Sequence, residues 1–235
     1  MPRSLGTSCL VLIVAACAAA PSTQPTDSEQ SMPAGLDACR ALVRAEPSHW
    51  PETMTAVLEL GPTAAPALVA ALREHDDGSG AEAAVAVLGR LGGMKARELL
   101  RELVGDRGPM AAAAALSLGD CGEPLDRTLL LATAEDRLAD ATLRAASTAS
   151  LLRLGARAEV RNLVRGILLA GTPYGRELEQ ALGLPHRPRW AYERHLLQLA
   201  LRDIAGQDFG LDTDAPWADL DRTATAVDTY LQTSR

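Results

Sequence analysis

The chain has 235 residues and a net charge of −7 at neutral pH, and 47% of its residues are hydrophobic although only 3% are aromatic. This apolar fraction is typical of a packed protein and excludes a chain that is disordered throughout. The excess of acidic residues leaves no basic stripe, so nucleic-acid binding is not expected. A core of this composition has to be built from Leu, Val and Ala, which lets helices approach one another closely.

The first sixteen residues have the features of an export signal. Arg3 provides a single positive charge, and Leu10 to Val14 provide an apolar stretch that is shorter than the ~20 residues of a spanning helix. The stretch ends in Val14-Ala15-Ala16-Cys17. This ending resembles the lipobox of bacterial lipoproteins, in which an aliphatic residue and two small residues precede a cysteine. The resemblance implies a lipoprotein signal peptide at 1–16, with diacylglycerol and an N-acyl chain such as palmitate attached covalently to Cys17.

Two other interpretations of the leader stay open. Ala18-Ala19-Ala20 has the A-x-A form of an ordinary secretory cleavage site, and the leader is alternatively a buried N-terminal helix. Both export interpretations place the protein outside the cytoplasm. Ala18, rather than Asp, follows Cys17, and similarity to Gram-negative sorting rules implies the outer membrane, with the protein facing the periplasm. Residues 17–35 are rich in Pro, Ser, Thr and Gln and are predicted to form a flexible tether.

A repeat of about 30 residues follows the tether. The glycines at 61, 92, 122 and 155 are 31, 30 and 33 residues apart, and each follows a Leu or Cys at the end of an apolar stretch. Each unit is predicted to be a helix, a glycine break and a second helix. The second helices carry apolar stripes of helical period, for example Ala96, Leu99, Leu100, Leu103 and Val104. A glycine at each break suits the left-handed conformation that ends a helix.

These Leu-Gly and Ala spacings resemble HEAT repeats, specifically the short bacterial form that is also seen in phycobilin-lyase-type proteins. The resemblance covers residues 36–170, with a leading helix over 36–46 and units at about 51–75, 80–105, 109–134 and 138–170. It implies an all-α fold, an α-solenoid of about four HEAT-like helical hairpins whose stacked surface holds another macromolecule. The alternative is an unrelated bundle of helices rich in Ala and Leu.

Residues 171–235 are predicted to form a helical C-terminal capping region. Three helices are expected, at about 174–183, 190–205 and 216–232. The second is expected to bury one face, made of Tyr192, Leu196, Leu199 and Ala200. The third is expected to bury Trp217, Leu220, Ala224, Val227 and Leu231. Phe209 and Trp217 are expected to hold this cap against the last repeat.

The chain carries no pattern that predicts an enzyme. Asp208-Phe209-Gly210 has the letters of the kinase magnesium motif, but no Gly-rich phosphate loop or His-Arg-Asp loop precedes it. The acidic residues between 208 and 221 lack the spacing of a calcium loop, and the four histidines lack the spacing of zinc ligands. His195 is expected to be a half-buried packing residue. Cys39 and Cys121 either form a disulfide or occupy small apolar core positions. We therefore expect no catalytic residue, metal site or small-molecule substrate, and no cofactor besides the lipid on Cys17.

The sequence predicts a membrane-anchored scaffold that mediates protein–protein interaction at the cell envelope. Two alternatives stay open: a catalytic or non-catalytic subunit of an envelope enzyme that uses the repeats as a platform, and a structural envelope component. One arginine cluster in the fourth unit is a candidate partner-binding surface, and a plain solvated surface is the alternative interpretation. Its members are Arg144, Arg153, Arg157, Arg161 and Arg165.

Overall fold

A computed structural model describes residues 35–75, 78–170, 191–207, 209–211 and 217–233. Within these ranges the chain forms eleven α-helices and two short 3-10 turns and contains no strand, which confirms the predicted all-α fold. The expected helix at about 174–183 lies outside the described residues. So do the leader and nearly all of the tether.

Each predicted repeat unit contains one pair of helices. The leading helix α1 is followed by the pairs α2/α3, α4/α5, α6/α7 and α8/α9, and then by α11 and α12. The bounds are α1 Leu36–Arg44, α2 Trp50–Glu59, α3 Ala65–Glu74, α4 Ala81–Leu91, α5 Met94–Asp106, α6 Ala111–Cys121, α7 Asp126–Glu135, α8 Ala141–Arg153, α9 Arg157–Leu169, α11 Ala191–Ala205 and α12 Trp217–Thr233.

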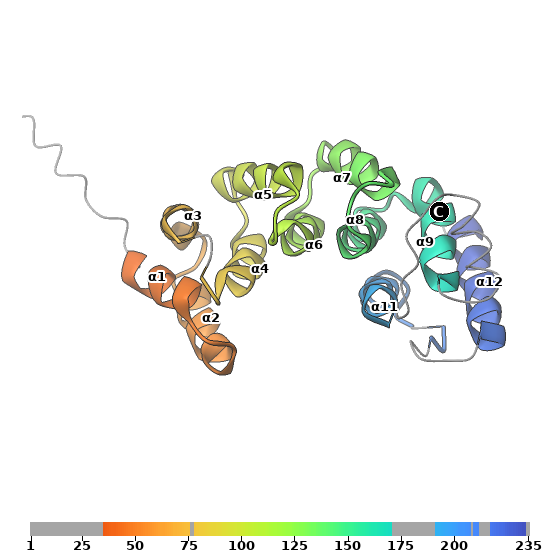
Figure 1. Ribbon diagram of the computed structural model, residues 1–235, viewed down its shortest axis with the longest axis horizontal. Coiled ribbons are helices and arrows are strands. Elements are labelled where there is room, and N and C mark those ends of the chain that lie inside the picture. The colour runs from red at the N-terminus through yellow and green to blue at the C-terminus, as the bar shows by residue number, and fades with distance from the viewer. Residues whose placement is uncertain (1–34, 76–77, 171–190, 208, 212–216, 234–235) are drawn as a thin grey trace, which may run out of the picture. The chain divides into compact units, whose positions relative to one another are not determined.

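The helices contact one another in two rows (Figure 1). In the first row α2 packs on α4, α4 on α6, α6 on α8, and α8 on α11. In the second row α3 packs on α5, α5 on α7, α7 on α9, and α9 on α12. The helix α1 packs on α2, α3 and α4 at the start of both rows. The last two helices therefore continue the two rows beyond residue 170.

Small residues let neighbouring helices of the first row approach closely. A Cβ atom on Gly89 of α4 would lie 2.7 Å from the Cβ of Ser117 in α6. A Cβ on Gly119 of α6 would lie 2.8 Å from the Cβ of Ser150 in α8. At each contact the buried serine hydroxyl donates to a main-chain carbonyl of the preceding helix, at 3.0 Å for Ser117 and 2.7 Å for Ser150. The same pair of features therefore joins α4 to α6 and α6 to α8.

Three of the four break glycines have a positive φ, but Gly61 and Gly92 differ from the expected left-handed helical conformation because their ψ angles are −168° and −157°. The φ angles are 71° at Gly61, 66° at Gly92 and 79° at Gly155. The expectation is also wrong for Gly122, where φ is −54°. A Cβ atom there would lie 1.9 Å from Cδ2 of Leu154 and 2.9 Å from the carbonyl oxygen of Leu118, so close contacts rather than a positive φ disfavour a side chain at this position.

The C-terminal end of α1 is covered by the loop before α4. The amide of Gly80 donates to the carbonyl of Val43 at 2.9 Å, and the Ser79 hydroxyl donates to the carbonyl of Ala45 at 2.9 Å. Nε1 of Trp50 donates to the same Ala45 carbonyl at 2.9 Å. Since the last carbonyls of a helix have no partner within the helix, these donors stabilise the end of α1. The donors at Ser79 and Gly80 also attach the leading helix to the second unit.

An ion pair between a half-buried arginine and a buried aspartate joins α5 to the start of α7. Nε of Arg101 lies 2.6 Å from Oδ1 of Asp126, whose side chain is completely buried. The other oxygen of Asp126 accepts from the amide of Glu123 at 3.1 Å, and the Glu123 carboxylate lies 2.6 Å from Arg97. The hydrogen bond to Asp126 raises the pKa of Arg101 above its ordinary value, so the guanidinium stays charged. The Asp126 carboxylate thus pairs with Arg101 of the preceding unit and also accepts a hydrogen bond from the turn that begins α7.

The buried face of α11 differs from the predicted one. Leu196 and Ala200 are buried as expected, but Tyr192 is 57% exposed and His195 is exposed. The helix also buries Leu197 and Leu201. The predictions for Tyr192 and His195 are therefore wrong, because α11 packs against α8 through a face that is turned toward Leu197 and Leu201.

The predicted seam of α12 is confirmed at the described positions. Leu220, Ala224, Val227 and Leu231 are all buried, and α12 packs on α9. The ring of Phe209 lies 5.2 Å, centroid to centroid, from the ring of Tyr230 in α12, and both are half-buried against the core. The side chain of Trp217 lies outside the described part of the chain.

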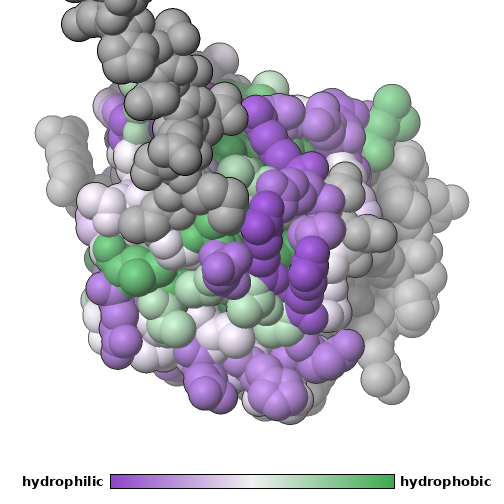
Figure 2. Space-filling view, turned by 90° about the vertical axis from the view of Figure 1, so that its left-hand side faces the viewer, coloured by the Kyte–Doolittle hydropathy of each residue, from purple (hydrophilic) through white to green (hydrophobic). Residues whose placement is uncertain are grey.

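Charged and apolar side chains are mixed on the surface around α1 to α3. Figure 2 shows small hydrophobic patches there between hydrophilic side chains. Across the described ranges, no single helix combines the length and the apolar character needed to cross a membrane. One bent pair, Pro47–Glu59 with Pro62–Glu74 at 104°, meets those criteria by length and composition only.

Candidate functional site

A groove of about 740 Å³ lies where the N-terminal turns of α4, α6, α8 and α11 meet the turns that precede α6 and α8. Its floor includes Ala111, Ala112 and Ala113, and its walls include Leu138 and Tyr192. Three consecutive alanines leave the first turn of α6 without bulky side chains, and this absence hollows the surface between the neighbouring helices. A volume of this size is in the range of ligand and side-chain binding pockets, roughly 300–1,000 Å³.

An apolar side chain is held in the open at this groove. Leu138 is 91% exposed, yet its backbone is fixed because its amide donates to Oδ1 of Asp136 at 2.9 Å. The other oxygen of Asp136 lies 2.5 Å from Arg107, which precedes the floor. These two donors, the Leu138 amide first, hold the pKa of Asp136 below its usual value. The position of Leu138 is therefore defined by a turn with its own hydrogen bonds.

Polar contacts join α8 to α11 beside the groove. Oδ1 of Asp140 accepts from the amide of Thr142 at 2.8 Å and so caps α8. The Thr142 hydroxyl donates to Oε1 of Glu193 at 3.1 Å. The side chain of Glu193 is 2% exposed, so α11 places a buried carboxylate against the start of α8. The wall that carries Tyr192 is thereby attached to the wall that carries Leu138.

One carboxylate of the groove stands apart from these contacts. Glu82 lies in the first turn of α4, is exposed, and makes no ion pair or hydrogen bond with another residue of the described ranges. At the floor, α6 begins without a capping side chain and without an acidic residue in its first turn. The groove thus combines an apolar centre with a single unpaired anion at its edge.

Two of the five predicted partner-binding arginines lie on α8 and contact different neighbours. Nε of Arg144 donates to the carbonyl of Ala134 at 3.2 Å, at the end of α7, and burial lowers its pKa. Arg153 lies 2.8 Å from Asp203 of α11 and 3.6 Å from Asp120 of α6. These guanidiniums therefore connect α8 to three surrounding helices.

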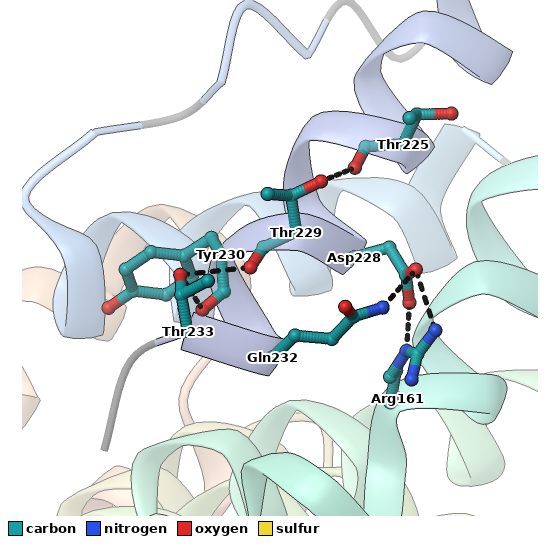
Figure 3. Close-up of polar contacts among 7 residues, drawn as sticks. All are labelled: Arg161, Thr225, Asp228, Thr229, Tyr230, Gln232 and Thr233. Carbon is teal, nitrogen blue, oxygen red and sulfur yellow. Dashed lines mark hydrogen bonds and ion pairs between the residues drawn. The ribbon is translucent and has the colours of Figure 1, made fainter.

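The other three arginines lie on α9 and face α12. The guanidinium of Arg157 is 5.4 Å from the ring centroid of Tyr230, and Arg165 lies 3.8 Å from Asp221. Arg161 makes two hydrogen bonds to Asp228, the one from its terminal nitrogen to Oδ2 measuring 2.9 Å (Figure 3). The five arginines therefore divide between two sets of neighbours, and each has a contact within the chain. Their role in binding a partner stays a prediction.

We expect Asp228→Asn to loosen α12. The pKa of Asp228 is lowered in the folded chain, mainly by the hydrogen bonds from Arg161. A lowered pKa stabilises the folded state above the ordinary pKa of aspartate, near 4, and this stabilisation is lost as the pH falls through the folded value. Amide hydrogen exchange in α12 should be several-fold faster than in the wild type at pH 7, and the difference should disappear once the pH is low enough to protonate Asp228 in the folded chain.

Asp219→Asn is the matched control on the same helix. Asp219 pairs with Arg222 one turn away at 3.2 Å, and both side chains are at least half exposed. Such exposed pairs contribute little. Equal acceleration by both variants would contradict a specific role of the contact between α9 and α12.

The remaining sequence predictions concern cysteine, histidine and metal chemistry. Cys39 and Cys121 are both free thiols, and burial raises the pKa of each. His195 lies 3.3 Å from Oε1 of Gln198 and does not line the groove. Among the described residues no group of three or more His, Cys, Asp or Glu could hold a metal ion. Cys17 and the acidic positions 208, 212 and 214 lie outside those residues.

Sequence reasoning did not predict the groove. The available signal was an alanine at the first position of each helix whose N-terminal turn lines it. These alanines are Ala81, Ala111, Ala141 and Ala191, at spacings of 30, 30 and 50 residues. The first two intervals are the repeat period, while the third is longer by the residues between α9 and α11.

Comparison with known proteins adds no further constraint on the site. No protein-family model, no curated protein sequence and no solved structure matches this chain.

Proposed function

We propose that this protein is a membrane-anchored, non-catalytic scaffold whose HEAT-like α-solenoid binds a protein partner at the cell envelope. The two rows of helices support the solenoid part of the proposal, since each helix packs on its counterpart in the next unit. The residues around Cys17 support the anchor.

The groove is the observation that carries the scaffold proposal. Leu138 and Tyr192 are large side chains with apolar surface in open solvent, and both line one hollow of about 740 Å³. Exposing such surface costs free energy in a chain that stays unbound, roughly 25 cal/mol for each Å². Large exposed side chains with apolar surface that line one hollow favour its use as an interaction site.

Cross-linking at the groove tests this proposal. A photo-reactive amino acid at position 138, in the full-length protein in its own membranes, should cross-link one recurrent protein. The same substitution at position 125 is the control, because Leu125 is a 77% exposed leucine that also precedes a helix but does not line the groove. No recurrent partner at position 138, or the same proteins at both positions, would contradict the proposal.

The anchor has a separate test. With a lipidated Cys17, radioactive or clickable palmitate should label the wild-type chain, and Cys17→Ser should lose all labelling. The variant should also leave the membrane fraction, because stable attachment needs two or more acyl chains, each methylene contributing about 0.8 kcal/mol. Cys39→Ser is the control that keeps the lipobox. Equal labelling of wild type and Cys17→Ser, or none in either, would refute the anchor.

A further inference from the structure

We propose that the groove binds a segment of a partner protein in which a large apolar side chain lies close to a Lys or Arg. This inference rests on the proposed scaffold function and specifies the chemistry that the partner must bring.

The apolar side chain fits the centre of the groove. The methyl groups of Ala112 and Ala113 line the floor, and Leu116 and Leu143 also line the groove. A leucine, phenylalanine or tryptophan placed there contacts the floor on one side and Leu138 on the other. Burial of one such side chain contributes about 1.5–3 kcal/mol. The walls need no rearrangement, because the turn at Asp136 already fixes the backbone of Leu138.

The cation follows from the charges at the edge of the groove. Three of its lining residues are charged: Arg107, Asp140 and Glu82. Arg107 is paired with Asp136, and Asp140 caps α8. Glu82 is the charge that no neighbour in the described ranges satisfies. A Lys or Arg of the partner would therefore pair with Glu82, and the net charge of −7 favours the approach of a basic segment.

A polypeptide fits the floor better than an aliphatic molecule does. The amides of Ala112 and Ala113 have no hydrogen-bond acceptor among the described residues, although neighbouring amides of this turn donate to Gly108 and Met110. Free amides at the start of a helix can donate hydrogen bonds to carbonyl oxygens. A peptide main chain supplies such oxygens beside its side chains, which a hydrocarbon chain lacks.

A random peptide library displayed on phage tests the inference with the purified full-length protein. The wild type should enrich peptides that carry a large apolar residue within a few positions of a Lys or Arg. Leu138→Ala and Tyr192→Ala should each weaken the best peptide about tenfold, the loss expected of residues that dominate an interface. Leu125→Ala should leave its affinity unchanged, and thermal unfolding of all variants should match the wild type.

Reversing the charge at Glu82 is the decisive test in the same experiment. Glu82→Lys should abolish enrichment of basic peptides and enrich acidic ones with the same apolar residue. Added salt should weaken binding to the wild type. The inference would be overturned if Glu82→Lys enriched the same peptides as the wild type. It would also be overturned if the wild type enriched acidic peptides or no peptides at all.

The outcomes also separate this inference from the scaffold function. If position 138 cross-links a partner that basic peptides do not displace, the scaffold stands and the proposed chemistry fails. If basic peptides bind the groove but no partner is found in membranes, the chemistry stands and the scaffold fails.

Discussion

Replacing Asp126 with alanine should lower the free energy of unfolding by about 1–3 kcal/mol, the usual result of leaving a hydrogen-bonding group without its buried partner. The Asp126 side chain is completely buried between Arg101 and the amide of Glu123. Its loss leaves Arg101 without its shortest contact and an amide without an acceptor. The measurement is equilibrium unfolding in urea, followed by circular dichroism at 222 nm.

Two further variants make this result specific. Asp120→Ala removes a half-exposed carboxylate that lies 3.6 Å from Arg153, and should cost less than about 1 kcal/mol. Asp126→Asn keeps an acceptor for the Glu123 amide and should fall between these two values. If Asp126→Ala lowered the free energy of unfolding no more than Asp120→Ala, the pair of Asp126 and Arg101 would not stabilise the chain.

Gly119→Ala should cost about 2 kcal/mol, although alanine is the better helix former. The added Cβ would lie 2.7–2.9 Å from the hydroxyl, Cβ and Cα atoms of Ser150. The Cα belongs to the backbone of α8, so the clash is relieved only if α6 and α8 move apart. That movement also lengthens the hydrogen bond from Ser150 to α6, now 2.7 Å.

Gly105→Ala is the matched substitution in α5. A Cβ there meets no atom within 4 Å, and the backbone has ordinary helical angles. This variant should therefore gain about 0.5–1 kcal/mol through the lower entropy of its unfolded chain. The two substitutions should therefore change the free energy of unfolding in opposite directions. Stabilisation by both would show that α6 and α8 tolerate a wider separation.

Local patterns were enough to predict most of the helices. The apolar stripe beginning at Ala96 and the Leu-Gly breaks depend on residues near in sequence, and α5 and the breaks lie where these patterns place them. The predictions for Tyr192 and Gly122 were wrong for a common reason. Tyr192 has its environment set by α8 and Gly122 by Leu154, and each of these neighbours lies far away in the sequence. Periodicity identifies a helix, but the face that it buries depends on its neighbour.

The candidate sites divide in the same way. The proposed lipobox rests on four consecutive residues that end at Cys17. The groove could not be predicted from a local motif, because its lining comes from four helices that start between residues 81 and 191. The arginines were recognised as a cluster, but their acidic partners stand far along the chain. Asp203 is 50 residues from Arg153, and Asp228 is 67 residues from Arg161.

The serine and glycine contacts of the first row bear on how such a chain can evolve. The helix α6 carries both a serine that donates a hydrogen bond to α4 and a glycine that allows the close approach of α8. A tandem copy of a unit with both features would carry the serine and the glycine that these two contacts need. Selection can thus lengthen the protein by duplicating whole units of about thirty residues, whereas a single added methyl group on these faces is penalised.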